Sequence, residues 1–248
     1  MPELSGRTAL VTGGAKRLGR AIAEALASEG ADIVVHYRTS EDEAREAGEQ
    51  LRQVGVQAWT VQADLADAEQ AQTLMGLSSE LAGRAPDILV NSASIFTPSG
   101  VLDFDAVELE RQLAVNTLAP LYLSRSFAES TGEGQIVNML DARMLEFDEE
   151  HAAYHLSKRA LFTLTRMLAL ELAPGIRVNG IAPGLILPPP GEDEAYLEGL
   201  AHTVPLNRHG SADDIVRAVM FLVHSPFVTG QVIYVDGGRH MKGRMYGS

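Results

Sequence analysis

A tyrosine and a lysine four residues apart are the pair in this sequence best suited to proton transfer. Tyr154 and Lys158 lie in a segment of helical periodicity from about Ala152 to Ala173, so both side chains share one helix face. An ammonium beside a phenol favours the phenolate, and we therefore expect the pKa of Tyr154 to lie below its usual value of about 10. The pair suits a tyrosine that donates a proton while a cofactor supplies hydride, and an exposed helix pair without chemistry is the alternative.

A glycine-rich segment separates the first apolar run, Thr8 to Val11, from an amphipathic stretch that begins at Leu18. Between Thr12 and Gly19 the chain reads Thr-Gly-Gly-Ala-Lys-Arg-Leu-Gly. Glycines between a strand and a helix allow a sharp turn and let a dinucleotide pyrophosphate approach the helix N-terminus. A tight turn with no ligand is the alternative, and the strand–turn–helix order favours nucleotide binding.

The end of the second apolar run predicts which nicotinamide cofactor binds. NAD enzymes usually carry a carboxylate there, which holds the ribose 2′-hydroxyl. This chain instead reads His36-Tyr37-Arg38-Thr39-Ser40. Arg38 and Ser40 can hold a 2′-phosphate through charge-assisted hydrogen bonds, and Lys16 and Arg17 add positive charge from the glycine-rich segment. A solvated loop position for Arg38 is the alternative, and we expect NADP(H) as the cofactor.

The elements that position these residues alternate along the chain. Apolar runs of strand length between amphipathic segments indicate a parallel sheet covered on both faces. The fold class is therefore α/β, a Rossmann-type doubly wound sheet of about seven strands with helices on both faces, in a single domain over residues 1–248. The expected strands are Thr8 to Val11, Asp32 to Tyr37, Ala58 to Ala63, Ile88 to Val90, Gln135 to Met139, Arg177 to Ile181 and Val232 to Val235. The expected helices are Leu18 to Ser28, Glu41 to Val54, Ala66 to Ala82, Ala106 to Ser130 and Ala152 to Ala173, and Pro183 to about Asp193 reads as a functional loop.

The composition limits the partners of the chain. Its 33 acidic and 20 basic residues give a net charge of -13, which disfavours nucleic acid and anionic membranes, and the basic run from Arg239 to Arg244 is too short to offset it. There is no cysteine, and the seven histidines lack paired ligand spacing, so we expect no metal. With no charged leader and no apolar run near the roughly 20 residues of a membrane span, we expect a soluble cytoplasmic protein with a small-molecule substrate.

In combination, these motifs resemble the short-chain dehydrogenase/reductase family over nearly the whole chain. The residues that carry the resemblance are Thr12 to Gly19, Asp64-Leu65, Asn91-Ser92-Ala93-Ser94, Asn116, Tyr154 with Lys158, and Pro183-Gly184. The resemblance implies that Asn116 helps carry a proton relay through Lys158. It also implies a set of cofactor-binding residues: Gly13, Lys16, Arg17, Leu18, His36, Tyr37, Arg38, Ser40, Asp64, Leu65, Asn91, Ala93, Ser94, Met139, Tyr154, Lys158, Pro183, Gly184 and Ile186.

Two departures from the family pattern narrow the reaction. Arg17 replaces the middle glycine of the turn, and Asp141 stands 13 residues before Tyr154, where the family usually has a catalytic serine. A serine hydroxyl suits a ketone oxygen as a hydrogen-bond donor. A carboxylate repels a developing alkoxide, yet it can orient Tyr154 or accept a hydrogen bond from a substrate N–H. The site therefore favours reduction of a C=N bond in a nitrogen heterocycle.

Both departures resemble the pteridine reductase branch of the family, which includes bacterial dihydromonapterin and dihydrofolate reductases. The branch implies that Phe96 stacks a pterin against the nicotinamide, since flat heterocycles pack well on aromatic faces. The implied catalytic residues are Asp141, Tyr154, Lys158 and Asn116, and the implied substrate-binding residues are Arg17, Ser94, Phe96, Asp141 and Tyr154. A packing role for Phe96 and a helix-capping role for Asp141 in an inactive protein are the alternatives, and Asn91-Ser92 departs from the usual Asn-Asn pair of the family.

Three functions follow in order of preference. The first is an NADPH-dependent reductase of pterins, dihydropterins or dihydrofolate. The second is a carbonyl reductase, such as a 3-oxoacyl-acyl carrier protein reductase or a sugar dehydrogenase, which Asp141 disfavours. The third is a catalytically silent nucleotide-binding protein, which the presence of Tyr154, Lys158 and Asn116 disfavours. We expect specificity to depend on the segment from Pro188 to Thr203, and the family implies a homotetramer formed through the two longest helices.

Overall fold

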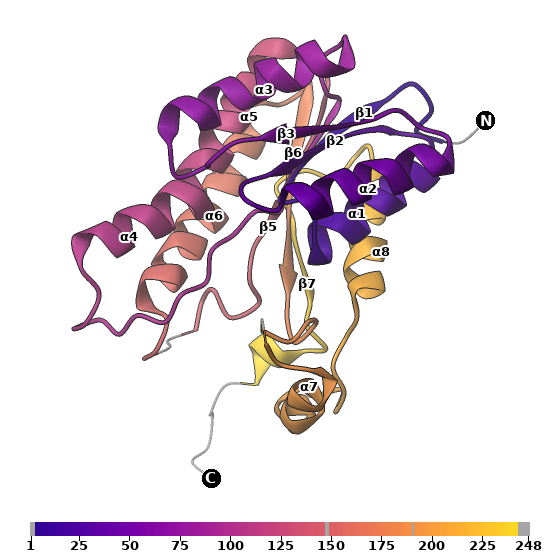
Figure 1. Ribbon diagram of the computed structural model, residues 1–248. Helices are drawn as coiled ribbons and strands as arrows, with labels where there is room; N and C mark the ends of the chain where they lie inside the picture. Colours follow the sequence, from indigo (N-terminus) through magenta and orange to yellow (C-terminus); the bar gives the residue numbers. More distant parts are fainter. Residues whose placement is uncertain (1–2, 147–148, 190, 243–248) are drawn as a thin grey trace.

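The chain builds a single parallel sheet at its centre. The computed structural model describes residues 3–146, 149–189 and 191–242, and their strands form a seven-stranded sheet of order β3-β2-β1-β4-β5-β6-β7 (Figure 1). Every pair of neighbours is parallel. The strands are β1 (Thr8–Thr12), β2 (Asp32–Tyr37), β3 (Ala58–Gln62), β4 (Ile88–Asn91), β5 (Gly134–Met139), β6 (Ile176–Pro183) and β7 (Val232–Val235). The strand order reverses between β1 and β4, so the expected doubly wound sheet is confirmed, and its ligand crevice lies at the carboxyl ends of these two strands.

Helices cover both faces of the sheet. One face packs against α1 (Arg17–Ser28), α2 (Glu41–Val54) and α8 (Ala212–Val223), and the other against α3 (Ala68–Ala82), α5 (Ala119–Ser130) and α6 (Ala152–Glu171) (Figure 1). Because the strands are buried on both faces, β1 and β4 read as continuous apolar runs without alternation. The sheet therefore forms a rigid base for the residues that follow each strand.

The expected long helix from Ala106 to Ser130 is interrupted in its middle. It consists of α4 (Ala106–Leu113), a π-helical turn (Ala114–Leu118) and α5. Pro120 lacks the N–H that would bond the carbonyl of Asn116 in an α-helix, which favours a wider turn at this point. The π-helical turn places Asn116 at the centre of the interruption, with its side chain buried.

Helix ends depart from expectation for local reasons. The third helix begins at Ala68 and not at Ala66 because the side chain of Asp67 caps it, accepting hydrogen bonds from the N–H groups of Glu69 (2.9 Å) and Gln70 (3.2 Å). The sixth helix ends at Glu171, ahead of Pro174, since the residue before a proline avoids the helical conformation.

The structure contains two helices that the sequence did not predict. They are α7 (Glu194–Leu200), which precedes a short 3-10 turn (Ala201–Thr203), and α8, which packs on the sheet beside α1. The expected specificity segment, Pro188 to Thr203, is thus helical from Glu194 onward. Its Pro190 lies outside the described residues, as do the last two residues of the basic run from Arg239 to Arg244. Within the described ranges, no helix is long and apolar enough to cross a membrane.

Candidate functional site

The glycine-rich turn lies at the carboxyl end of β1, against the chain that follows β4. Thr12 Oγ1 accepts hydrogen bonds from the N–H groups of Ser92 and Ala93, both at 3.0 Å. Gly13 has φ +63°, and a Cβ there would lie 3.1 Å from the Cα of Ala93. A Cβ on Gly19 would overlap the carbonyl of Gly13. The glycines therefore allow a close approach of three backbone segments, as the turn of a dinucleotide-binding fold requires.

His36 supports this glycine-rich turn through its side chain. Its Nδ1 accepts a hydrogen bond from the N–H of Gly13 (3.1 Å), and its Nε2 lies 3.1 Å from the carbonyl of Ala63, to which it donates in this tautomer. Burial lowers the pKa of His36 to about 4, so the imidazole is neutral at working pH and keeps the acceptor that Gly13 needs. Both ring nitrogens bond the protein itself. His36 thus shapes the cofactor turn through these two hydrogen bonds, a role with no signal in the sequence.

Arg17 adopts an unusual backbone conformation at the start of α1. Its φ of +54° lies in the left-handed region that favours glycine, which is the residue the family usually has there. The guanidinium donates a hydrogen bond to the carbonyl of Pro188 at 2.7 Å and so links the glycine-rich turn to the expected specificity segment. Backbone strain at such a position costs about 1–3 kcal/mol and is typical of functional sites.

The residues expected at the 2′-phosphate surround the start of α2. Arg38 is exposed, and Ser40 precedes the helix without capping it, so its hydroxyl is available to a ligand. Lys16 forms an ion pair with Glu43 of the first turn, with 2.5 Å between Nζ and Oε1. That pairing lowers the pKa of Glu43, chiefly through the hydrogen bond from Lys16. The end of β2 therefore offers three donors around one helix N-terminus, which favours an anion.

The structure brings Asp141 and Tyr154 into direct contact. Tyr154 comes from the first turn of α6, and its hydroxyl donates to Asp141 Oδ2 at 2.9 Å. Asp141 follows β5, and its Oδ1 accepts the N–H of Arg143 at 2.7 Å, which fixes the carboxylate. Both carboxylate oxygens are thus engaged by donors. The expected ability of Asp141 to orient the tyrosine hydroxyl agrees with this geometry.

The expected direction of the Tyr154 pKa was wrong. Burial raises the pKa of Tyr154 well above 10, and the charge of Asp141 and its hydrogen bond raise it further. Lys158 Nζ lies 5.7 Å from the ring centroid of Tyr154 and donates to the carbonyl of Met139 at 2.9 Å. Burial lowers the pKa of Lys158 to about 8, and Asp141 opposes that shift. The ammonium is therefore too distant to outweigh burial and an adjacent carboxylate.

Asn116 is held by groups on three elements. Its side-chain N–H groups donate to the carbonyl of Ile95 (3.0 Å), to Gln112 Oε1 (2.9 Å) and to Ser157 Oγ (3.0 Å). Its Oδ1 accepts from the N–H of Ile95 at 3.0 Å and from the Ser94 hydroxyl at 3.1 Å. These bonds fix Asn116 between α6 and the segment after β4. Gln112 and Ser157 are supporting residues that sequence reasoning missed, because only the tertiary fold brings them together.

Phe96 lies at the entrance of the site. Its side chain is 55% exposed, and its ring meets that of Tyr154 edge-on with centroids 4.7 Å apart. This exposure disfavours a core role for Phe96. Loop packing stays an alternative, and the stacking role of Phe96 stays a prediction.

The remaining expected cofactor residues line the carboxyl ends of β3 to β6. Asn91 donates to Asn138 Oδ1 at 2.8 Å, while its own Oδ1 is buried without a hydrogen-bond partner in the described chain, so a ligand donor fits there. A Cβ on Gly184 would lie 2.5 Å from Asp236 Cβ, so only glycine allows this close turn. The other residues of the set fall into two groups by burial. Those that are buried are Leu65, Met139 and Ile186, and those that are half-buried are Leu18, Tyr37, Asp64, Ala93 and Pro183. The orphaned amide oxygen, the glycine turn and the donors near α2 together fit a dinucleotide.

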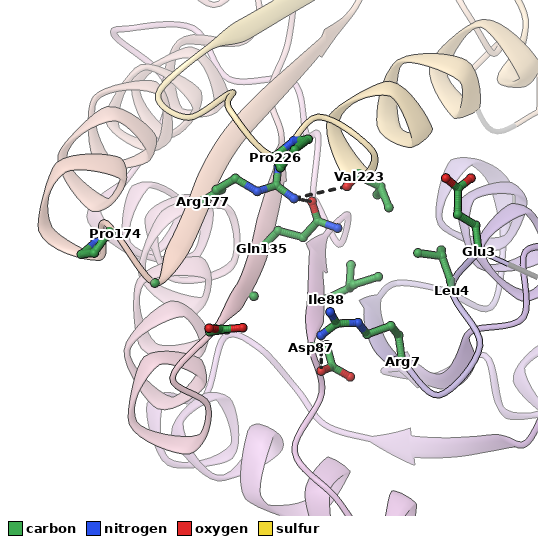
Figure 2. Close-up of a pocket in the computed structure, with 13 residues that line it drawn as sticks. Glu3, Leu4, Arg7, Asp87, Ile88, Gln135, Pro174, Arg177, Val223 and Pro226 are labelled. Atoms are coloured by element: carbon green, nitrogen blue, oxygen red, sulfur yellow. Dashed lines mark hydrogen bonds and ion pairs between the residues drawn. The ribbon is translucent and has the colours of Figure 1, made fainter.

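A cavity of about 380 Å³ opens at the amino ends of the strands, the edge of the sheet opposite the expected cofactor crevice (Figure 2). Arg177 on its wall donates to the carbonyls of Leu222 and Val223 and to Gln135 Oε1, which closes the carboxyl end of α8. Arg7 is paired with Asp87 at 3.0 Å. Arg177, Arg7 and Asp87 therefore serve the packing of strand and helix ends, away from the reaction centre.

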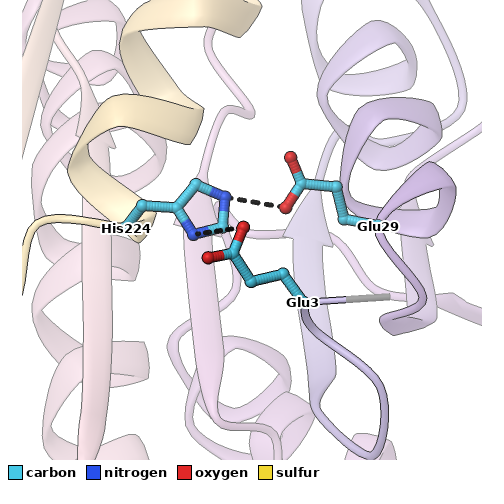
Figure 3. A group of neighbouring side chains, drawn as sticks. All are labelled: Glu3, Glu29 and His224. Atoms are coloured by element: carbon cyan, nitrogen blue, oxygen red, sulfur yellow. Dashed lines mark ion pairs between the residues drawn. The ribbon is translucent and has the colours of Figure 1, made fainter. Parts of the chain in front are cut away.

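A histidine and two glutamates gather near that same edge (Figure 3). His224 Nε2 lies 2.7 Å from Glu29 Oε2, and Nδ1 lies 3.7 Å from Glu3 Oε2. The two carboxylates approach different nitrogens of one ring, whereas a metal ion binds a single imidazole nitrogen. The arrangement is that of an imidazole bridging two acids, and the expectation of no metal stays a prediction.

Comparisons with known proteins place this geometry in a family. The family model described as enoyl-(acyl carrier protein) reductase matches residues 13–240. Pteridine reductase 1 of Leishmania tarentolae is 37% identical, over 93% of this chain and 95% of that protein. Versicolorin reductase 1 of Aspergillus parasiticus is 34% identical, over 95% of this chain and 97% of that protein.

Among solved structures, FolM alternative dihydrofolate reductase 1 from Brucella canis, complexed with NADP, superposes with a TM-score of 0.90 at 35% identity. The match covers 98% of this chain and 97% of that one. Similar structures crystallised with NADP or NADPH agree with the donors at the end of β2, and the cofactor is NADP(H). The chain therefore belongs to the short-chain dehydrogenase/reductase family of oxidoreductases, in a branch that resembles the pteridine reductases.

Proposed function

We propose that this oxidoreductase uses NADPH to reduce a C=N bond of a pterin, dihydropterin or dihydrofolate-type heterocycle. The observation that carries the proposal is the 2.9 Å hydrogen bond from the Tyr154 hydroxyl to Asp141 Oδ2. A carboxylate at this place disfavours an alkoxide, and it suits a substrate whose ring bears N–H donors. The similarity to a pteridine reductase and to an alternative dihydrofolate reductase supports the same substrate class.

The cofactor would be held by the crevice at the β1–β4 switch point. In this proposal the turn from Gly13 to Leu18 receives the pyrophosphate, with Lys16, Arg38 and Ser40 at the 2′-phosphate. Asp64, Leu65, Asn91, Ala93, Met139, Gly184 and their neighbours would border the adenine and the nicotinamide. Bound NADPH supplies the hydride. The residues of the chain bind and orient it, and they control the proton.

Tyr154 is the proton donor in this proposal. Its pKa is raised by burial and by Asp141, so the phenol is protonated through the neutral range and the hydrogen bond to Asp141 fixes the direction of its hydroxyl. When the proton moves to the substrate nitrogen, negative charge develops on the phenol oxygen. The buried Lys158 ammonium stabilises that charge, and Asn116, held beside α6, would connect the pair to a relay that returns the proton.

Substrate recognition in this proposal uses the open face of the site. Phe96 supplies the stacking platform, and Ser94 and Arg17 flank the slot with polar groups. Arg17 also reaches the Pro188 carbonyl, which connects the slot to the segment expected to determine specificity. Exposed apolar side chains on α6, among them Met167 at 61% and Leu170 at 83%, support assembly with further copies through this helix, as the homotetramer expectation requires.

A carbonyl reductase is the second candidate, because an NADPH-dependent aldehyde reductase-like protein of Arabidopsis thaliana is 33% identical over 95% of this chain. One assay separates the functions: NADPH oxidation with dihydrobiopterin, dihydrofolate, oxidised biopterin or an acetoacetyl thioester. We expect turnover of a pterin and little of the thioester, with Tyr154→Phe as the inactive control. Brisk thioester reduction without pterin turnover would replace the proposal by the carbonyl reductase. Cofactor binding without any turnover would favour a silent nucleotide-binding protein.

A further inference from the structure

The ring of Phe96 has a second aromatic neighbour, which neither the proton transfer nor cofactor binding uses. The imidazole of His151 lies parallel to the Phe96 ring, with centroids 4.1 Å apart and an interplanar angle of 10°. The same phenyl ring is nearly perpendicular to the ring of Tyr154, with an interplanar angle of 81°. His151 is the residue immediately before α6, and Tyr154 lies in its first turn. One short piece of chain therefore supplies both aromatic neighbours of Phe96.

The backbone fastens these two segments together as well. Ser99 and His151 form a parallel bridge outside the main sheet. The N–H of Ala152 donates to the Ser99 carbonyl at 2.7 Å, and the N–H of Ala153 donates to Ser99 Oγ at 3.3 Å. The loop that carries Phe96 is thus docked on the start of the helix that carries Tyr154. Any movement of the phenyl ring has to break the imidazole stack.

We propose that His151 is a positioning residue that backs the Phe96 platform, so that a flat heterocycle stacks on the opposite, open face of the ring. The inference rests on the proposed function, because it assumes that Phe96 receives the substrate. A half-exposed phenylalanine on a loop samples several rotamers, and ordering it on binding costs affinity. A preformed stack with the imidazole removes most of that cost before the substrate arrives.

The imidazole acts through ring shape in this proposal. His151 makes no capping hydrogen bond to α6, so its removal does not uncap the helix. Truncation should therefore weaken substrate binding and leave the proton donor in place. Aromatic pairs of this kind contribute affinity in the range of about 2- to 12-fold. A planar replacement such as phenylalanine should keep the stack, whereas alanine should lose it.

The test compares His151→Ala and His151→Phe with the wild type, with His224→Ala as a matched substitution at the far edge of the sheet. We expect His151→Ala to raise KM for dihydrobiopterin about 3- to 10-fold, with kcat and the NADPH Kd nearly unchanged. His151→Phe should restore KM. Titration of the enzyme–NADP complex with a non-reducible 2,4-diaminopteridine should show the same order of Kd values.

Three outcomes of the KM comparison overturn the inference. An unchanged KM in His151→Ala means that the stack does not position the platform. Equal damage in both His151 variants means that the histidine acts through something other than ring shape, and a lower KM in His151→Ala means that the imidazole competes with the substrate. If the wild type reduces no pterin, the proposed function fails, and the diaminopteridine titration still decides whether His151 supports a stacking site. If the diaminopteridine does not bind at all, both the proposed function and the inference about His151 are refuted.

Discussion

Replacing Asp141 tests the proposed chemistry at the residue that distinguishes it. Asp141→Ala removes the acceptor of the Tyr154 hydroxyl (2.9 Å) and the acceptor of the Arg143 N–H (2.7 Å). Asp141→Asn is the sharper variant, because its amide oxygen keeps the second bond while the charge is lost. A hydrogen bond to a charged group contributes about 1.5 to 3 kcal/mol, so kcat/KM for a dihydropterin should fall about ten- to a hundred-and-fifty-fold. NADPH affinity should change little.

The same substitution should move the pH profile in a defined direction. Lys158 has a pKa of about 8, and Asp141 raises it against the effect of burial. Activity that needs the ammonium is present below this pKa and is lost as the pH rises through it. Without the carboxylate the pKa of Lys158 falls, so the alkaline limb of kcat/KM should move to lower pH in Asp141→Asn than in the wild type. The measurement is NADPH oxidation with dihydropterin across the range from about pH 6 to about pH 9.

Asp141→Ser completes the series, since it restores the residue that ketone-reducing relatives use. This variant should lose pterin turnover and gain reduction of an acetoacetyl thioester. The reasoning is refuted if pterin reduction is indifferent to Asp141→Ala while the unaltered enzyme reduces the thioester briskly. In that case Asp141 only shapes the turn after β5, through its bond to Arg143.

Three further substitutions test the cofactor site and the proton donor. NADPH should be preferred over NADH by at least about tenfold, or about 1.4 kcal/mol, and Arg38→Asp should move kcat/KM toward NADH; comparable values for both cofactors in the wild type would contradict this. Tyr154→Phe should keep NADPH binding and lose about 10² to 10⁴ in rate, and wild-type turnover would remove Tyr154 from the mechanism. Gly19→Ala should weaken NADPH binding, because the added Cβ meets the Gly13 carbonyl. The control Gly76→Ala adds a Cβ in open space and should bind NADPH normally. Equal NADPH Kd values for both variants would show that the close approach at Gly19 is dispensable.

Much of the fold was predictable because strand and helix periodicity differ. Apolar runs such as Asp32 to Tyr37 and Val232 to Val235 match β2 and β7 at both ends. The α8 helix was missed although its signal is local: Ser211 and Asp214 form a capping box, and an apolar face follows. The α7 helix is harder to predict, because it follows a proline-rich segment, is only seven residues long and buries Leu197 alone.

The sequence predicted a set of site residues, but it did not predict their energetics. Spacing on a helix indicated Tyr154 and Lys158, and composition at the end of β2 indicated a phosphate site. The pKa of Tyr154 depends on burial and on a carboxylate that the fold brings from the end of β5, and helical spacing contains neither. The bond from Arg17 to Pro188 likewise joins residues 171 positions apart. Contacts of this kind become visible only when the chain is folded.

Asp141 changes the pKa values of two neighbouring groups, Tyr154 and Lys158. Burial raises the pKa of Tyr154 and Asp141 raises it further, and Asp141 also opposes the burial that lowers the pKa of Lys158, so the carboxylate favours the protonated form of both groups. A phenol with so high a pKa is a weak acid and protonates only a strongly basic product. Hydride addition to a C=N bond leaves an anionic nitrogen that is more basic than an alkoxide, and its protonation gives a neutral N–H that can donate to Asp141. Addition to a ketone leaves a less basic alkoxide, which draws the Tyr154 proton less strongly while the carboxylate opposes its charge, and there a serine hydroxyl would serve better.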